Sequence, residues 1–197
     1  MSISTVLEQR NLISGEKLKS IFDELYSDIL TFDISSSSGF ISSMWARYES
    51  GENSLNGKVF EGLLACLLYR KKILPIFVQA KLAFVPNVDF DFVTHTKEFG
   101  PIVLSAKTSL RERYKQADLE GMMLRQVHRK SKSYLLTLDI PAANTVNKKI
   151  QKGEVLGLDD VIVATSRRFD DLIRELTSYN YDQPAKVDVI NSTKVIV

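Results

Sequence analysis

Two aspartates and a lysine lie on neighbouring predicted strands and are of the types that metal-dependent phosphate chemistry needs. Asp89 and Asp91 alternate with apolar residues over 88–93, so both carboxylates are expected on one side of a strand. Lys107 ends the next predicted strand, 102–107, which should form a hairpin with the first. Mg²⁺ takes one or two carboxylates, waters and substrate phosphates, and a positioned lysine stabilises charge on a phosphate. The pattern therefore indicates magnesium-dependent chemistry at a phosphate ester.

Other groups could complete the ligands of that metal. The backbone carbonyl of Ala106, in the second strand, is one of them. Glu61 is another, because in the helix predicted over 58–71 it shares a face with Leu64 and Leu68 and so points towards the apolar side. A glutamate placed there needs a partner or a metal ion.

Glu120 is the alternative source of a second carboxylate. It follows Lys107 by 13 residues, in a helix predicted over 110–129, and shares a helix face with Arg113 and Gln116. A salt bridge to that arginine is the simpler interpretation of Glu120, just as a half-buried strand is the simpler interpretation of the aspartates taken alone.

Positive charge is concentrated in one segment of the chain. Residues 107–132 hold eight lysines or arginines against three acidic residues, whereas the rest of the chain holds 18 basic and 21 acidic residues. A basic segment on a mildly acidic body indicates a polyanionic partner such as nucleic acid. A solvated helix face with internal salt bridges would give the same count.

The periodicity of apolar residues predicts an α/β fold, with a mixed sheet flanked by helices and a helical region at the N-terminus. Helices are predicted over 16–31, 41–48, 58–71, 110–129 and 168–179, and loops over 35–39 and 51–57. Strands are predicted over 77–84, 88–93, 102–107, 133–138, 161–164 and 186–197. With 197 residues the chain is expected to form one domain, 1–197, with a helical subregion over 1–50 and a core over 58–179.

Composition points to an intracellular protein. The single cysteine, Cys66, lies in an apolar run and is expected to be a core thiol in a reducing cytoplasm. No apolar run approaches the roughly 18 residues that a membrane span needs, so no membrane partner is expected.

Over roughly 58–138 the chain resembles the PD-(D/E)XK nucleases, especially type II restriction endonucleases. Asp91 matches the first acid of the motif, and Ser105-Ala106-Lys107 matches its second half, with Ser105 where an acid normally stands. One subgroup, cutters of CCGG and CCNGG-type sites, has its displaced acid on the following helix, where Glu120 lies. The resemblance implies a restriction-endonuclease-like sheet, Mg²⁺ as cofactor, and catalytic roles for Asp91, Lys107, Glu120 and Glu61, with Asp89 as a rival of Asp91.

The same subgroup has a charged cluster after its lysine, as this chain has in Arg111-Glu112-Arg113. The resemblance implies that this cluster reads base edges. Arginine can bond two acceptors of guanine at once, and glutamate accepts from the amino group of cytosine. The DNA-contacting residues are therefore expected to be Ser109, Arg111, Glu112, Arg113, Lys115 and Gln116.

Together these patterns predict a Mg²⁺-dependent endonuclease that cuts double-stranded DNA at a short, G/C-containing palindrome. A palindromic site is matched by a homodimer with two-fold symmetry. A PD-(D/E)XK nuclease of another kind, such as a repair, homing or structure-specific enzyme, is the nearest alternative. A DNA-binding module without activity is another, motivated by Ser105, and a scaffold with a basic helix is a third.

Overall fold

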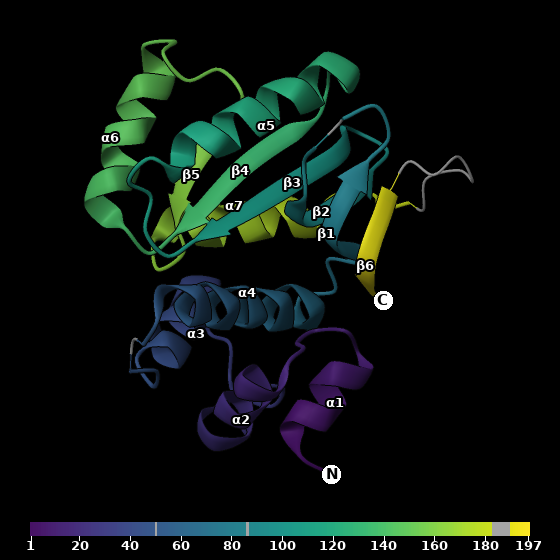
Figure 1. Ribbon diagram of the computed structural model, residues 1–197, viewed down its shortest axis with the longest axis vertical. Helices are drawn as coiled ribbons and strands as arrows, with labels where there is room; N and C mark the ends of the chain where they lie inside the picture. The colour runs from purple at the N-terminus through teal and green to yellow at the C-terminus, as the bar shows by residue number, and fades with distance from the viewer. Residues whose placement is uncertain (50, 86, 183–189) are drawn as a thin grey trace.

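The computed structural model describes residues 1–49, 51–85, 87–182 and 190–197. Its centre is a six-stranded mixed sheet of order β5-β4-β3-β2-β1-β6 (Figure 1). The pairs β6–β1, β1–β2 and β2–β3 are antiparallel, whereas β3–β4 and β4–β5 are parallel. The strands are β1 (Ile76–Leu82), β2 (Phe90–Thr96), β3 (Gly100–Lys107), β4 (Lys132–Thr137), β5 (Asp160–Val163) and β6 (Ile190–Ile196).

Helices cover both faces of this sheet, which confirms the predicted α/β class. The helices are α1 (Ile3–Gln9), α2 (Glu16–Leu25), α3 (Ser37–Trp45), α4 (Asn53–Arg70), α5 (Arg113–Val127), α6 (Ile140–Gln151) and α7 (Arg167–Thr177). Helices α5 and α6 lie on one face, α4 and α7 lie on the other, and α1, α2 and α3 pack outside α4 (Figure 1). No helix in the described ranges is long and apolar enough to cross a bilayer.

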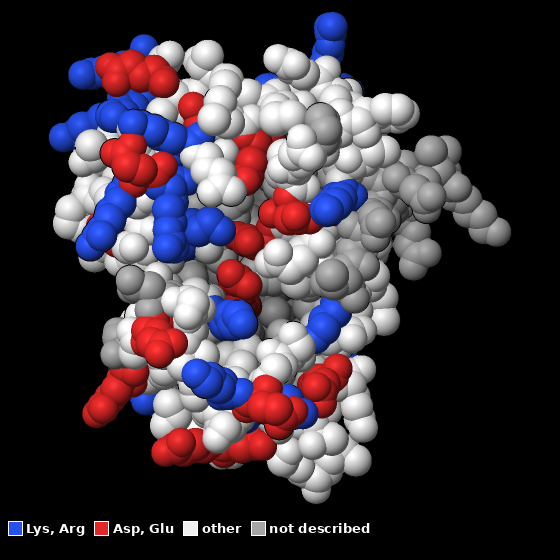
Figure 2. Space-filling view, viewed as in Figure 1, with Lys and Arg blue, Asp and Glu red and all other residues white. Residues whose placement is uncertain are grey.

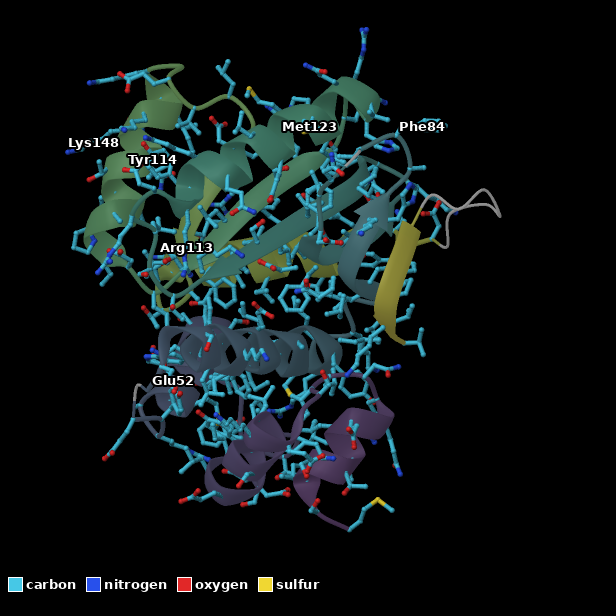
Figure 3. All side chains as sticks on the ribbon, in the orientation of Figure 1. Glu52, Phe84, Arg113, Tyr114, Met123 and Lys148 are labelled. Atoms are coloured by element: carbon cyan, nitrogen blue, oxygen red, sulfur yellow. The ribbon has the colours of Figure 1, made fainter. Side chains whose placement is uncertain are left out.

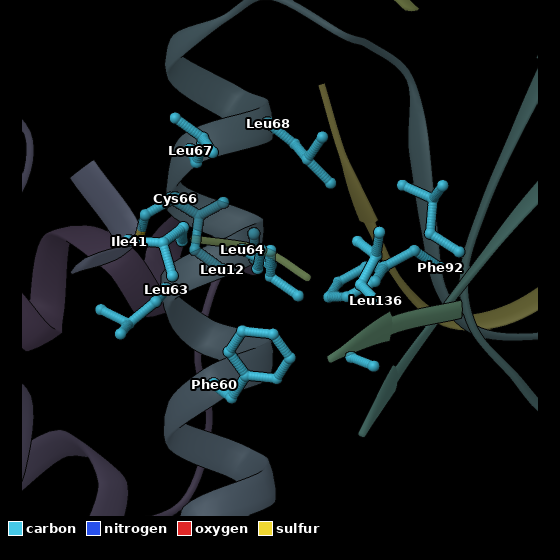
Figure 4. Close-up of a cluster of buried hydrophobic side chains, with 14 of the residues drawn as sticks. Leu12, Ile41, Phe60, Leu63, Leu64, Cys66, Leu67, Leu68, Phe92 and Leu136 are labelled. Atoms are coloured by element: carbon cyan, nitrogen blue, oxygen red, sulfur yellow. The ribbon is translucent and has the colours of Figure 1, made fainter. Parts of the chain in front are cut away.

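Helix α4 is apolar on nearly every side because it lies between two layers. Leu63 and Leu67 lie towards the N-terminal helices, while Leu64 and Leu68 lie towards the sheet (Figure 4). Cys66 is fully buried in this cluster with a free thiol, and burial raises its pKa, so the predicted core thiol is confirmed. This packing fixes the position of α4 over the strands that carry the candidate site.

Several predicted boundaries are wrong. The serine cluster predicted as a loop over 35–39 instead starts α3, because the Ser36 hydroxyl accepts a hydrogen bond from the Gly39 N–H at 3.0 Å. Helix α2 ends at Leu25, not near 31, and α4 begins at Asn53 inside the predicted loop. Strand β6 agrees with the predicted edge strand over 190–196, and the rest of that prediction, 186–189, lies outside the described residues.

Helices α1 and α6 were not predicted. The start of α6 is defined by Asp139, whose Oδ1 accepts from the Ala142 N–H at 3.1 Å, and by Pro141 in the first turn. Its buried residues, Ala143 and Val146, are few and small, so the apolar period that reveals a helix is weak.

Gly157 is expected to tolerate no side chain. A Cβ atom there would lie 1.9 Å from the backbone oxygen of Asp118 on α5, whose carboxylate also accepts from the Gly157 N–H. Gly157→Ala should therefore lower the free energy of unfolding by about 1–3 kcal/mol or more, measured by urea unfolding. Gly57→Ala is the control, because no atom lies within 4 Å of its Cβ position and alanine should stabilise α4 by about 0.5–1 kcal/mol. Equal stability of the two variants would contradict the steric argument.

Candidate active site

The hairpin of β2 and β3 brings Asp91 and Lys107 into contact. Lys107 Nζ donates to Asp91 Oδ2 at 2.7 Å, and the Ala106 N–H donates to the same oxygen at 2.8 Å. Gln79 on β1 points its amide Nε2 at Asp91 Oδ1, 3.4 Å away. Asp91 is only 8% exposed, and a carboxylate so buried is stable only with such partners. An ammonium group and a fixed backbone donor therefore hold this carboxylate at the mouth of a cleft.

Glu61 reaches the same place from α4. It lines a cleft of about 470 Å³ together with Asp91 and Gln79, and an adjoining cleft of about 390 Å³ together with Lys107 and Arg113. Burial raises the pKa of Glu61 to about 7, and the charge of Asp91 adds to the rise, while Lys107 opposes it. Figure 2 shows the molecule hollowed between the sheet and the helical layer below, with acidic side chains at the hollow.

Glu120 lies on α5 near the same group of charges. The amide Nε2 of Gln116 donates to its Oε1 at 2.7 Å. Burial raises the pKa of Glu120, while the hydrogen bond from Gln116 and the charge of Lys107 oppose the rise. The hydrogen-bond partner of Glu120 is thus Gln116 and not the arginine of the simpler interpretation. The charge of Asp91 also raises the pKa of Glu120.

Asp89 does not share a strand with Asp91, so that prediction is wrong. Strand β2 begins at Phe90, and Asp89 precedes it as an exposed residue. Its carboxylate lies 3.6 Å from Lys81 Nζ, and both side chains are more than half exposed. An exposed pair of this kind contributes little to stability, and Asp89 is not held towards Lys107 as Asp91 is.

The predicted DNA-contacting residues lie on the loop after β3 and on the first turn of α5. This helix begins at Arg113 and not at 110 as predicted, because Leu110 is fully buried and anchors a loop before it. Ser109, Arg111 and Glu112 are exposed on that loop, and Arg111 has a φ of 35°.

The first turn of α5 carries the remaining members of the predicted set. Arg113 and Gln116 line the cleft that holds Lys107, whereas Lys115 is exposed and pairs with Glu112. Figure 3 shows Arg113 near the end of the sheet, with Glu52 of the helical layer below it. Residues predicted to read bases therefore adjoin the predicted catalytic lysine.

The residues present fit a divalent cation that is also ligated by substrate. No group of three or more His, Cys, Asp or Glu side chains within the described ranges could hold a metal ion unaided. Mg²⁺ commonly needs only one or two carboxylates, with waters and substrate phosphates completing its shell. Asp91 and Glu61 face one cleft. Burial raises the pKa of Glu61, the charge of Asp91 adds to the rise, and a bound cation would offset both effects.

The order of the strands and the placement of the helices define a restriction-endonuclease-like fold. The solved structure of the restriction endonuclease PspGI with its substrate DNA is similar, with a TM-score of 0.55 over 87% of this chain and 82% of that chain. The two sequences are 16% identical, so the likeness is one of fold. No protein-family model and no curated protein sequence matches this chain.

Two residues that line the cleft, Gln79 and Lys58, were not predicted from the sequence. Lys58 lines the larger cleft, and its charge lowers the pKa of Glu61. Lys58 precedes Glu61 by three residues on α4, and this helical spacing could have identified it as a neighbour of Glu61. No pattern in the sequence marks Gln79, because its place opposite Asp91 depends on strand register.

Proposed function

We propose that this protein is a Mg²⁺-dependent, sequence-specific endonuclease that cuts double-stranded DNA in the manner of type II restriction enzymes. The contact of Asp91 with Lys107 at a cleft that also receives Glu61 carries this proposal. The exposed basic loop beside the cleft supports a nucleic acid as substrate. The similarity in fold to a restriction endonuclease that was solved with its substrate DNA adds to it.

In the proposed mechanism, Asp91 and the Ala106 carbonyl hold the metal, with Glu120 or Glu61 as the second carboxylate and Asp89 as the less favoured acid. A bound metal would supply a Lewis acid for the phosphate and would lower the pKa of a water molecule. Lys107 leaves Asp91 and places its ammonium beside the scissile phosphate, where it offsets the charge that develops there.

The loop after β3 is proposed to read the DNA sequence. Arg111, Glu112 and Arg113 would bond base edges in the major groove, and Ser109, Lys115 and Gln116 would hold the backbone or neighbouring bases. Burial of Leu110 supports this role, because a fixed loop loses little entropy on binding. A homodimer is proposed, in which each subunit cuts one strand of a palindromic site.

The test is to incubate the purified protein with unmethylated phage DNA, either with Mg²⁺ or with EDTA. Discrete fragments in Mg²⁺ alone are expected, and sequencing their ends would give the recognition site and the stagger of the cuts. A smear would instead favour a repair or structure-specific nuclease of the same fold.

DNA binding without cleavage is the second candidate function. Ser105 favours it, because this buried residue occupies the place of the second motif acid and can supply no carboxylate. Intact DNA in every condition, together with retarded migration of the DNA in a gel, would support this function against the first.

Arg113→Ala is expected to lose discrimination at one base pair of the site. If Arg113 bonds a guanine edge, its removal should cost about 1–3 kcal/mol at that position and little elsewhere. Cleavage rates on a set of duplexes with single base-pair changes would measure this. Arg129→Ala, an exposed arginine beyond the far end of α5, is the matched control. An equal loss on every duplex would place Arg113 on a phosphate instead.

A further inference from the structure

Gln79 has a backbone conformation that is rare inside a β-strand. It lies in the middle of β1 with a φ of 50°, in the left-handed region that non-glycine residues rarely adopt. Val78 pairs with Phe92 and Ala80 with Phe90, so the register with β2 continues without an extra residue. A β-bulge, a common cause of such a kink, is therefore not the reason for it.

The pairing of β1 with β6, its other neighbour, also contains no extra residue at Gln79. Val78 pairs with Lys194 of β6 and Ala80 with Ser192, so one residue of each strand lies between these pairs. Alternate residues of a regular strand face the same side. Here Val78 packs against the cluster around α4, whereas Ala80 belongs to a cluster that includes Leu124 of α5. Strand β2 makes the same change between Phe90 and Phe92, so the two strands turn their side chains together at Gln79 and Asp91.

The consequence of this kink is a contact with Asp91. Gln79 and Asp91 each lie between the same two pairs of the β1–β2 register, and the Nε2 of Gln79 lies 3.4 Å from Asp91 Oδ1. The other oxygen, Oδ2, already accepts from Lys107 and from the backbone of Ala106. Both oxygens of the carboxylate therefore have donors, and the amide lies on the side that the other two donors leave open.

We propose that Gln79 is a positioning residue of the active site, retained in a strained conformation because that conformation aims its amide at Asp91. Strained residues persist where the surrounding structure holds them, and they concentrate at functional sites. This inference rests on the proposed nuclease function. It goes further by adding a residue from β1, outside the Asp91–Lys107 hairpin, to the groups that orient the metal-binding carboxylate.

The variant Gln79→Gly tests the side-chain amide separately from the strained backbone. Glycine adopts a φ of 50° without penalty, so the variant should fold and melt at the same temperature as the wild type or higher. It lacks the amide, so the binding of Mn²⁺ alone, followed by electron paramagnetic resonance of the free ion, should weaken. Removing a group that orients a metal ligand weakens metal binding or activity about 10–100-fold. The single-turnover cleavage rate at fixed Mg²⁺ should fall by a similar factor.

Lys72→Gly is the matched control, because Lys72 has a φ of 57° and is exposed at the end of α4. It should gain the same relief of strain with no change in Mn²⁺ binding. Wild-type Mn²⁺ affinity and cleavage in Gln79→Gly would overturn the inference and leave the nuclease assignment standing. A wild-type protein that neither binds Mn²⁺ nor cuts DNA would overturn both, so the two failures are distinguishable.

Discussion

Lys107→Ala is expected to stop DNA cleavage while DNA binding persists. Loss of one preorganised charge at a reacting phosphate typically costs about 10²–10³-fold in rate, and here the same ammonium is also the partner of Asp91. Single-turnover cleavage in saturating Mg²⁺ measures the rate, and gel retardation in Ca²⁺ measures binding. Cleavage at the wild-type rate would remove Lys107 from the proposed active site.

A loss of cleavage in Lys107→Ala must be distinguished from a loss of the folded structure. Without Lys107, the carboxylate of Asp91 keeps the Ala106 N–H but loses its ammonium partner at a buried position, and some loss of stability is expected. Thermal unfolding of Lys107→Met, which keeps part of the aliphatic stem, shows whether the fold survives. Lys152→Ala, an exposed lysine at the end of α6, is the matched control and should cut normally.

Glu61→Gln is expected to stabilise the protein in alkaline buffer and to leave its stability unchanged in acid. The pKa of Glu61 is about 7 in the folded protein against 4.5 for an ordinary glutamate, so the folded state holds the proton more tightly. Protonated Glu61 thus favours folding, and this contribution is complete below about pH 4.5 and is lost as the pH rises through about 7. A pKa difference of this size corresponds to roughly 1–3 kcal/mol.

Urea unfolding of the wild type and of Glu61→Gln at a series of pH values tests this. The wild type should lose stability between about pH 5 and pH 8 relative to the variant, which has no proton to release. Glu24→Gln, at an exposed position on α2, should run parallel to the wild type. Parallel curves for the wild type and Glu61→Gln would mean that Glu61 is solvated as ordinary surface glutamates are.

The pairing of Asp91 with Lys107 at the centre of the site follows from local sequence pattern. Alternation around Asp91 and the apolar run before Lys107 predict two strands, and a short connection makes them antiparallel neighbours. Contacts within a hairpin follow from local pattern, so the approach of this acid to this lysine could be predicted. The same local logic predicted the apolar helix that became α4 and the burial of Cys66.

Local sequence pattern did not predict the ends of helices and strands that are set by capping or by packing. Asp89 and Asp91 look equivalent in the alternating pattern, yet β2 begins between them and only Asp91 is buried. The serines around Ser36 read as a loop, although one of them caps α3. Helix α6 has too small an apolar face to produce a clear period.

The other groups that join Asp91 and Lys107 are placed by tertiary packing and strand geometry. Glu61 reaches the cleft because the leucines of α4 pack between the sheet and the N-terminal helices, which sets the rotation of that helix over β2 and β3. Gln79 reaches Asp91 because strand register and a left-handed backbone place it there. Glu61 is far from Asp91 in the chain, and its approach depends on packing free energy summed over many side chains. Gln79 is only 12 residues from Asp91, but its contact depends on a left-handed backbone that no local spacing encodes.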